Sequence, residues 1–306
     1  MEQTCAPPIL MRLYGQLMHR IPVSSGLTRL SFNFFTNRQF SHCHGLLMAA
    51  LLNKMLITTE PNDYNGRVLY LFGTNDPKVQ AVVQALLCPG DRFLDIGANY
   101  SSIGLLAIDS VTSDGQIHLF EPQPQICHYV EEAIKAAGIT NVYLHKVALM
   151  DHDGEMRLSL CQNHSGMATL VDSSRQDGWD SIPVPVRDIA AYVQPLVGSK
   201  PFGVKIDVEG AEPVIMPWLL KQPNLKFLVF EADRNQKELW DLVKASELVP
   251  YGLKRLVFAR RISRIQSYDE ILLYHDLVAI RFPASFVAPQ DIDVRHLGQM
   301  INRKHV

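Results

Sequence analysis

The sequence predicts an α/β fold with a doubly wound, mostly parallel sheet, and two observations support this prediction. Short apolar segments with strand composition alternate with helical segments between residues 92 and 230. All but one of these strand segments end at or next to a carboxylate side chain. Because parallel neighbours need long right-handed crossovers, the alternation favours a parallel sheet with helices on both faces.

The first elements of this fold precede the alternating region. A turn cluster at Asn62–Gly66 is followed by Arg67–Phe72, which has strand composition, and Gly73 ends that segment. A helix then begins after Asn75-Asp76-Pro77, since these residues supply a cap and a first turn. The pair Pro89-Gly90 ends this helix.

The alternating region contains five predicted strands and two predicted helices. The strands are Arg92–Ile96, Gln116–Phe120, Val142–Val147, Val204–Ile206 and Phe227–Phe230. The helices are Ile103–Ile108 and Ile126–Ala137, the second closed by Gly138. Two later segments, Leu253–Val257 and Asp276–Arg281, have strand composition without a strong helix between them. They predict an antiparallel hairpin at the end of the sheet.

The composition excludes several classes of protein. The chain has 306 residues with 29 Lys and Arg against 31 Asp and Glu, and 47% of its residues are hydrophobic. This balance is too apolar for a disordered protein and lacks the basic excess that nucleic-acid binding requires. The longest apolar stretch, Leu46–Ile57, is too short to cross a bilayer, and the first ten residues do not resemble a secretion signal. We therefore expect a cytoplasmic protein with no membrane span.

We expect three parts: an N-terminal helical extension over residues 1–60, a main domain over 61–285 and a tail over 286–306. Within the extension, Leu46–Ile57 is the strongest helical candidate, and it could pack on the domain or on a second copy of the chain. The five cysteines are scattered, with no Cys-x-x-Cys pair, and their spacing suggests neither a disulfide framework nor a zinc site. We predict no metal site, although a metal held by carboxylates is not ruled out.

Ligands of open α/β sheets bind outside the carboxyl ends of the strands, so the residues that follow each strand are the candidates for function. The loop after the first strand of the alternating region contains Gly97, Ala98 and Asn99, small residues that suit a close approach of backbone to ligand. Glu121 ends the next strand, 24 residues after Gly97, at about the distance where an acidic residue binds both hydroxyls of a ribose. Asp95 before the glycine disfavours a diphosphate and favours a positively charged group. A ribose joined to a cationic amino-acid group predicts S-adenosylmethionine.

Four segments of the sequence also resemble, in order, the FkbM-type family of S-adenosylmethionine-dependent methyltransferases. These segments are Phe93–Asn99, Phe120–Pro122, Ala148–Gly154 and Val204–Glu212. The resemblance covers roughly residues 65 to 282, and the run Lys-Ile-Asp-Val-Glu-Gly-Ala-Glu at 205–212 is its most specific part. It implies a seven-stranded, Rossmann-like class I methyltransferase fold and O-methylation of a hydroxyl on a sugar, polyketide or related small molecule.

The resemblance also implies where the cofactor lies. Asp95, Gly97, Ala98 and Asn99 would line the methionine part and Glu121-Pro122 the ribose, with Val147-Ala148 at the adenine edge. One residue departs from the family pattern, because Ser101 stands where the family loop has its second glycine. A serine there could narrow the cofactor pocket.

The acceptor hydroxyl must lose a proton during transfer, and carboxylates near the methyl position are the candidates for accepting it. Asp207 and Glu209 follow a strand at this point, so we predict Asp207 as the catalytic carboxylate and Glu209 as its partner. His164, in a polar loop, and Glu231, after the last parallel strand, are weaker candidates for contacting the substrate. Most lone histidines and rim carboxylates have no such role.

Structural roles are favoured for two other charged residues. Lys205 lies inside a predicted strand, where it could form a buried ion pair with Asp95 or Glu231. Glu212 begins the following helix, where a carboxylate is stabilised by unpaired amides.

Two alternative functions remain open at this point. An NAD-dependent oxidoreductase would use the same sheet class, but the loop lacks Gly-x-Gly-x-x-Gly and no tyrosine has a lysine four residues later. A non-catalytic partner protein could keep the fold without turnover, and only Ser101 favours that. No pattern identifies the acceptor, although Arg255, Arg260, Arg261 and Arg264 could bind a phosphate or carboxylate on it.

Overall fold

A computed structural model of the chain describes residues 5–301 except 44, 172–177, 233–235 and 285. At its centre is a nine-stranded sheet whose strands lie in the order β14-β12-β11-β13-β10-β9-β3-β4-β5. The five strands β10, β9, β3, β4 and β5 are parallel to one another, and the other four are antiparallel to their neighbours. The order turns back at β3, which pairs with both β4 and β9, so the topological switch point lies at this strand.

The parallel strands have the boundaries expected of short, fully buried segments. They are β3 (Arg92–Ile96), β4 (Gln116–Phe120), β5 (Val142–His145), β9 (Phe202–Ile206) and β10 (Leu225–Glu231). The antiparallel strands are β11 (Val249–Leu253), β12 (Arg261–Arg264), β13 (Asp276–Ile280) and β14 (Asp291–Asp293).

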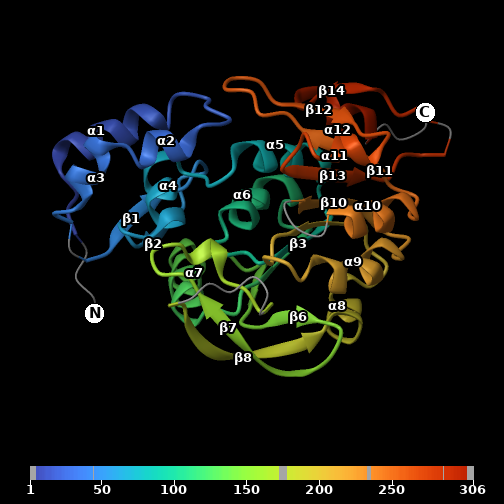
Figure 1. Ribbon diagram of the computed structural model, residues 1–306, viewed down its shortest axis with the longest axis horizontal. Helices are drawn as coiled ribbons and strands as arrows, with labels where there is room; N and C mark the ends of the chain where they lie inside the picture. The colour runs from blue at the N-terminus through green and yellow to red at the C-terminus, as the bar shows by residue number, and fades with distance from the viewer. Residues whose placement is uncertain (1–4, 44, 172–177, 233–235, 285, 302–306) are drawn as a thin grey trace.

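Helices cover both faces of the sheet (Figure 1). One face packs against α5 (Pro77–Leu86), α6 (Ser102–Val111), α7 (Pro124–Ala137) and α12 (Val294–Ile301). The other packs against α8 (Ile189–Val197), α9 (Glu212–Leu220), α10 (Gln236–Lys244) and α11 (Tyr268–Ile271). Successive side chains of β3 point to opposite faces of the sheet. Phe93 therefore packs in the core on the first face, and Leu94 and Ile96 pack in the core on the second.

The N-terminal unit, residues 5–72, lies beside the sheet with a small core of its own (Figure 1). It contains α1 (Ile9–Met18), α2 (Leu27–Ser31), α3 (Phe34–Phe40), β1 (Leu47–Ala50), β2 (Leu56–Thr59) and α4 (Tyr64–Phe72). Below the sheet edge, β6 (Ala148–Met150), β7 (Gly154–Leu160) and β8 (Asp180–Asp188) form a three-stranded sheet, and a 3-10 turn, η1, spans Ser165–Met167.

The structure confirms the α/β class and the parallel strands, but it corrects the predicted number of strands and the predicted terminal hairpin. The strands β11 and β13 do pair antiparallel, but β12 and α11 lie between them in the sequence, so they form no hairpin. The sheet has nine strands rather than seven, because β12 and β14 extend it beyond β11. The predicted strand Leu253–Val257 is also shifted: β11 ends at Leu253, and residues 254–257 belong to the turn before β12. The predicted strand Asp276–Arg281 agrees with β13.

Two local predictions near the N-terminus are wrong. The segment Leu46–Ile57 is not a helix but most of the β1–β2 hairpin, whose turn places Lys54 at φ 70°. The segment Arg67–Phe72 is not a strand but the body of α4. Asp63 caps this helix by accepting from the N–H of Gly66 at 2.8 Å, and Gly73 ends it at φ 69°. Local caps therefore override strand composition here.

The structure also contains a disulfide that the cysteine spacing did not predict. Cys5 and Cys43 are bonded, and they join the segment before α1 to the segment after α3. The two cysteines are 38 positions apart in the sequence, so only the tertiary structure brings the two thiols together. Among the described residues, every helix falls short of the length and apolar character that a bilayer span needs.

Candidate functional site

A cavity of about 520 Å³ lies at the carboxyl ends of β3, β4, β9 and β10, at the switch point of the sheet. Its floor is the turn after each strand. Its opposite wall comes from α4 of the N-terminal unit and from the loop at 164–170. The cavity therefore lies where an open α/β sheet binds ligands.

Gly97 makes the first turn of the floor possible. Its φ is 72°, and a Cβ at this position would lie 1.8 Å from the carbonyl oxygen of Asp207. The N–H groups of Gly97 and Ala98 both donate to the carbonyl of Phe120 at 3.0 Å. The turn is therefore held between the ends of β4 and β9, and only glycine fits there.

A buried ion pair lies directly beneath this turn. The Nζ of Lys205 is 3.3 Å from a carboxylate oxygen of Asp95, and it donates to the carbonyl of Gly97 at 2.8 Å. Asp95 also accepts the N–H of Gly104 at 2.9 Å. Burial alone would lower the pKa of Lys205, but Asp95 and then Asp207 outweigh it and leave that pKa raised. Asp95 thus braces the turn from below and is not among the residues that line the cavity.

Glu121 lies at the end of β4 with only 2% of its surface exposed, and it lines the cavity. One carboxylate oxygen accepts the N–H of Asn99 at 2.7 Å, and the other accepts the N–H of Gln123 at 2.9 Å. Burial raises the pKa of Glu121, while these hydrogen bonds oppose the rise. Each oxygen can accept one more hydrogen bond, which suits two adjacent hydroxyl groups of a ribose.

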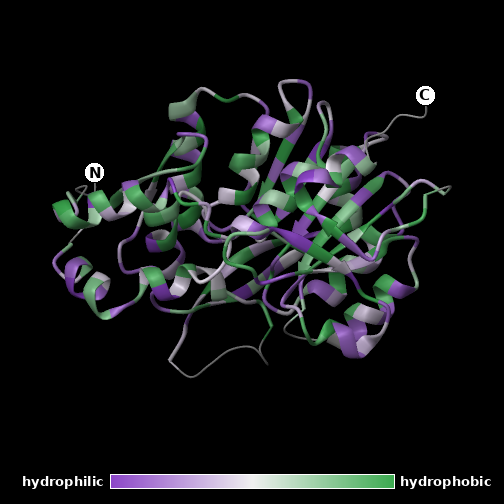
Figure 2. Cartoon of the chain, turned by 90° about the horizontal axis from the view of Figure 1, so that it is seen from above, coloured by the Kyte–Doolittle hydropathy of each residue, from purple (hydrophilic) through white to green (hydrophobic). Residues whose placement is uncertain are grey.

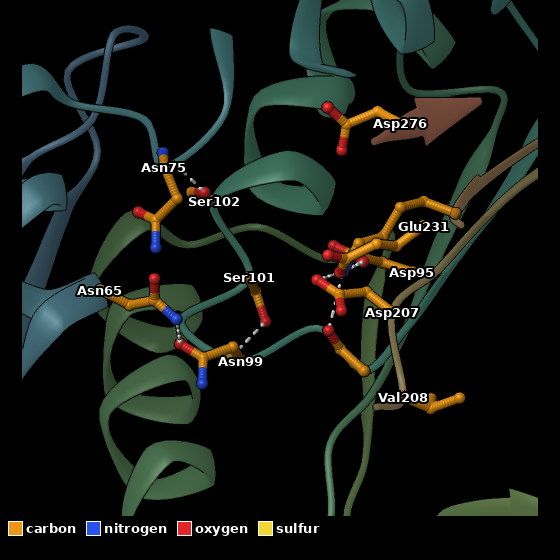
Figure 3. Close-up of polar contacts among 12 residues, drawn as sticks. Asn65, Asn75, Asp95, Asn99, Ser101, Ser102, Asp207, Val208, Glu231 and Asp276 are labelled. Atoms are coloured by element: carbon orange, nitrogen blue, oxygen red, sulfur yellow. Dashed lines mark hydrogen bonds and ion pairs between the residues drawn. The ribbon is translucent and has the colours of Figure 1, made fainter. Parts of the chain in front are cut away.

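Side chains from three distant segments meet around Asn99, and Figure 3 shows its contact with Asn65. The Nδ2 of Asn65 on α4 donates to Oδ1 of Asn99 at 3.3 Å, and the Nδ2 of Asn99 donates to the hydroxyl of Ser165 at 3.0 Å. Asp63 holds Ser165 in turn, accepting its N–H at 2.6 Å and its hydroxyl at 3.0 Å. This network fixes the wall of the cavity onto its floor.

His164 is held over the cavity by aromatic stacking. Its ring lies 4.3 Å from that of Tyr64, nearly parallel to it, and Tyr64 stacks on Phe32 at 5.0 Å. Burial lowers the pKa of His164, against the pull of Asp63. The ring is therefore in its neutral form at pH 7.

Three carboxylates gather at the ends of β9 and β10. Oxygen atoms of Asp207, Glu209 and Glu231 all lie within 4.8 Å of one another, and this trio could hold a metal ion. The positive φ of Glu209, 54°, turns the chain so that Asp207 and Glu209 reach the same space despite their spacing of two. Lys205 lies 3.5 Å from Asp207 and partly balances the trio.

A histidine bridges the rim of the cavity. His275 lies 3.2 Å from Asp276 and 2.6 Å from Glu231. Its hydrogen bonds to Asp276 and to Glu231 raise the pKa of His275 to about 10, so this ring is positively charged at pH 7. The rim therefore carries a cation in direct contact with Glu231.

Two buried polar atoms of the wall have no hydrogen-bond partner among the described residues. They are Nδ1 of His164 and Oδ1 of Asn75, and both residues line the cavity. A polar ligand in the cavity would satisfy them, since buried polar groups are normally paired. Together with Glu121, they fit a polyhydroxylated ligand such as an adenosine derivative.

The structure brings together nearly all of the residues predicted from the sequence. The predicted residues that line the cavity are Gly97, Ala98, Asn99, Glu121, Pro122, Val147, Ala148, His164, Asp207, Glu209 and Glu231. Asp95 lies beneath it, paired with Lys205 as a structural ion pair. Glu212 accepts the N–H groups of Val208 and Gly210 and so shapes the loop before α9.

Sequence reasoning missed the wall that faces the floor. Tyr64, Asn65, Asn75 and Ser165 line the cavity, as does His275 at the rim. Asn75 had a local signal as part of the cap before α5, and Tyr64 and Asn65 lay in the predicted turn cluster, but these signals indicated structure rather than ligand binding. Ser165 follows His164 in the polar loop, where only His164 was singled out. The basic cluster at 255–264 is not among the residues that line this cavity.

Comparison with known proteins adds a family match. Residues 95–274 match the model of a family described as the methyltransferase FkbM domain. No curated protein is similar enough in sequence to count as a relative.

Several solved structures are similar to parts of the chain. A precorrin-6y C5,15-methyltransferase from Geobacter metallireducens GS-15 is 13% identical over 67% of this chain and 89% of its own, with a TM-score of 0.39. An O-methyltransferase from Bacillus cereus in complex with SAH is 11% identical over 66% and 79%, with a TM-score of 0.38. An rRNA methylase from Streptococcus thermophilus is 8% identical over 65% and 90%, with a TM-score of 0.37.

Proposed function

We propose that this chain, which belongs to the FkbM family of S-adenosylmethionine-dependent methyltransferases, methylates a hydroxyl group of a small molecule such as a sugar or a polyketide. The observation that supports this most is the cavity at the switch point. It places the ribose-type carboxylate Glu121 and the acidic trio of Asp207, Glu209 and Glu231 around one enclosed space.

The cofactor site follows from the floor of the cavity. Glu121 would accept the two ribose hydroxyls with its remaining lone pairs, and the turn Gly97–Asn99 would hold the methionine part. Pro122, Val147 and Ala148 would cover the adenine. When bound, S-adenosylmethionine supplies an electrophilic methyl group on a positively charged sulfur.

The trio would act on the acceptor. Methyl transfer is an in-line displacement, in which the acceptor oxygen forms a bond to the methyl carbon as the carbon–sulfur bond breaks. The hydroxyl proton would pass to Asp207, with Glu209 as its partner. Glu231 and His164 would orient the acceptor by hydrogen bonds, His164 through the ring nitrogen that has no partner. Alignment of the hydroxyl would lower the barrier by several kcal/mol, and by roughly 7 to 11 kcal/mol where the geometry is ideal.

The charge of the lining also supports an uncharged acceptor. Asp76, Asp276 and the trio surround the outer part of the cavity, and the cations among the lining residues are Lys205 and His275. Lys78 pairs with Asp76 and Asp276, so the lining carries fewer positive than negative side chains but is not without cations. A phosphate or carboxylate would be repelled by this set, whereas hydroxyl groups can donate to it. A neutral, polyhydroxylated acceptor is therefore the class that fits best.

Calorimetric titration with S-adenosylhomocysteine tests the cofactor half of the proposal. We expect saturable binding that Glu121→Ala weakens at least about 100-fold, because the variant removes two hydrogen bonds to a desolvated charge. Glu131→Ala, on the exposed side of α7, is the matched control and should bind like the unchanged protein. The proposal would be overturned if the folded protein does not bind S-adenosylhomocysteine, or if it binds NAD more tightly.

A transfer assay tests the second half. Hydroxylated acceptors are screened with methyl-labelled S-adenosylmethionine, and Asp207→Asn is compared with the unchanged protein. We expect the variant to keep its affinity for S-adenosylhomocysteine and to lose about 100-fold or more in turnover. Tight cofactor binding with no transfer to any hydroxyl would support the non-catalytic alternative instead.

A further inference from the structure

The N-terminal unit exposes an apolar stripe on its first helix. Ile9, Leu10, Leu13 and Leu17 of α1 are exposed, Ile9 by 72%, Leu13 by 57% and Leu17 by 53%. At 100° per residue these four side chains fall within an arc of about 100°. The opposite face of α1 buries Met11 and Met18 against the core of the unit. We call the four exposed residues the N-terminal apolar stripe.

The stripe is part of a wider concentration of exposed apolar side chains. Phe34, at the start of α3, is 83% exposed, and α3 lies at the same end of the molecule as α1 (Figure 1). Hydrophobic segments are visible in the helices of this end when the chain is coloured by hydropathy (Figure 2). Nine of the 17 large apolar side chains that are exposed among the described residues lie between residues 9 and 56. A single soluble surface rarely gathers so many unless something covers it.

The charge of the same unit is one-sided. Residues 3–59 contain five Lys and Arg and no Asp or Glu, while the whole chain has 31 acidic residues. Arg12 lies on α1 beside the stripe and Arg20 follows the helix, and both are exposed. The covering partner should therefore offer both apolar contact and negative charge.

A second apolar and basic element is attached to this unit. The tip of the β11–β12 hairpin exposes Val257 and Phe258 between Arg255 and Arg260. The N–H of Ser24 donates to the carbonyl of Val257 at 2.7 Å, which fixes the tip against the loop before α2. This contact holds Arg255 and Arg260, which do not line the cavity, next to the N-terminal unit.

We propose that the N-terminal unit is a membrane-docking surface, in which the N-terminal apolar stripe enters the headgroup region of an anionic lipid bilayer while the arginines around it contact lipid phosphates. Amphipathic helices bind lipid surfaces in this way, by apolar burial combined with attraction to negative headgroups. The disulfide between Cys5 and Cys43 ties the segments that flank α1 and α3, so the surface is presented as one unit. This proposal does not rest on the proposed reaction.

Docking would also place the cavity near the lipid. Helix α1 packs on α4, and Tyr64 and Asn65 of α4 line the cavity wall. Helices α1 and α4 thus lie between the cavity and a bilayer bound to the outer face of α1.

Co-sedimentation with vesicles tests the proposal on the full chain. We expect binding to vesicles of equal parts phosphatidylcholine and phosphatidylglycerol, and little binding to phosphatidylcholine alone. Leu13→Asp combined with Leu17→Asp should reduce binding at least about tenfold, because it removes apolar burial and adds repulsion. Leu273→Asp is the matched control, since Leu273 is 76% exposed but lies far along the chain, and it should bind like the unchanged protein.

A second variant keeps the test decisive if the double leucine variant unfolds, as judged by circular dichroism. Arg12→Glu with Arg20→Glu leaves the stripe intact and should also weaken vesicle binding about tenfold. Absence of vesicle binding by folded, unchanged protein would overturn the proposal. Light scattering shows whether the unchanged protein is a dimer. A dimer that becomes a monomer in the variant Leu13→Asp with Leu17→Asp would overturn the membrane proposal and identify a second copy of the chain as the partner.

Discussion

The two walls of the cavity are built by different means. The floor, formed by the turns after β3, β4 and β9, depends on backbone: Gly97 approaches Asp207 where no Cβ fits, and backbone N–H groups hold Glu121. The opposite wall depends on side chains, since Asn65 and Ser165 reach Asn99 across more than 30 residues of sequence. The floor is thus held in position by the sheet, whereas the wall is held in position by hydrogen bonds between side chains.

This difference suggests how the cavity could admit a ligand. The floor is fixed by the hydrogen bonding of five parallel strands, whose opening would require unfolding of the domain. The wall at 164–170 is attached by a limited set of hydrogen bonds. Asp63 accepts two from Ser165, and Asn99 and Gln123 donate to the same residue. Thr169 bonds to Ser159 and Glu209. A ligand could therefore enter by local release of the wall, at a much lower cost in free energy.

The largest effect should come from breaking the floor. In Gly97→Ala the new Cβ would meet the carbonyl of Asp207, and the free energy of unfolding should fall by at least about 3 kcal/mol. Gly90→Ala is the matched control: its φ is 84°, but nothing lies within 4 Å of the Cβ position, so a loss of only about 1 kcal/mol is expected. Urea unfolding measures both, and equal losses would show that strain rather than close approach governs the turn.

A smaller effect is expected from releasing the wall. Asp63→Ala removes the acceptor for three donors, on Ser165 and Gly66, and should lower the free energy of unfolding by about 2 to 3 kcal/mol. Asp188→Ala, which removes an ordinary helix cap at α8, should cost about 1 kcal/mol.

Hydrogen exchange in these two variants distinguishes local opening of the wall from unfolding of the whole domain. In Asp63→Ala the amide of Ser165 should exchange faster than the amides of β3, whereas Asp188→Ala should leave Ser165 unchanged. Uniform acceleration over the whole chain would contradict a wall that opens on its own.

The floor could be predicted from the sequence because its rules are local. A strand followed by Gly97, and a carboxylate at the end of the next strand, indicate their role through spacing alone. The boundaries of β3 and β4 agree with the prediction for the same reason, since short apolar runs between turn residues define them. The position of Asp95 was less visible, because only the fold shows that it lies beneath the turn and pairs with Lys205.

The wall and the N-terminal unit could not be predicted, because their contacts are not local. The partners of Ser165 are Asp63 and Asn99, far away in the chain, and no spacing rule relates them. The segment Leu46–Ile57 is apolar enough for either a helix or a hairpin, and pairing between β1 and β2 decides the outcome. In α4, capping by Asp63 serves both the helix and the wall, so the same missed contact explains the wrong strand and the missing site residues.

The smallest expected effect concerns Ser101, which stands where the family loop has glycine. Its φ is 57° and it is fully buried, yet it is not among the residues that line the cavity. Ser101→Gly should therefore remove the free-energy cost of a left-handed serine, but it also raises the conformational entropy of the unfolded chain. The two effects nearly cancel, and the protein should become more stable by about 0.5 kcal/mol. Affinity for S-adenosylhomocysteine should change less than about twofold, since no cofactor contact is altered.

Ser101→Ala keeps the strain and loses the hydroxyl that donates to the carbonyl of Asn99, so it should destabilise the protein slightly in urea unfolding. A tenfold change in affinity with Ser101→Gly would instead make this serine part of the floor, and the floor would then depend on a side chain as the wall does.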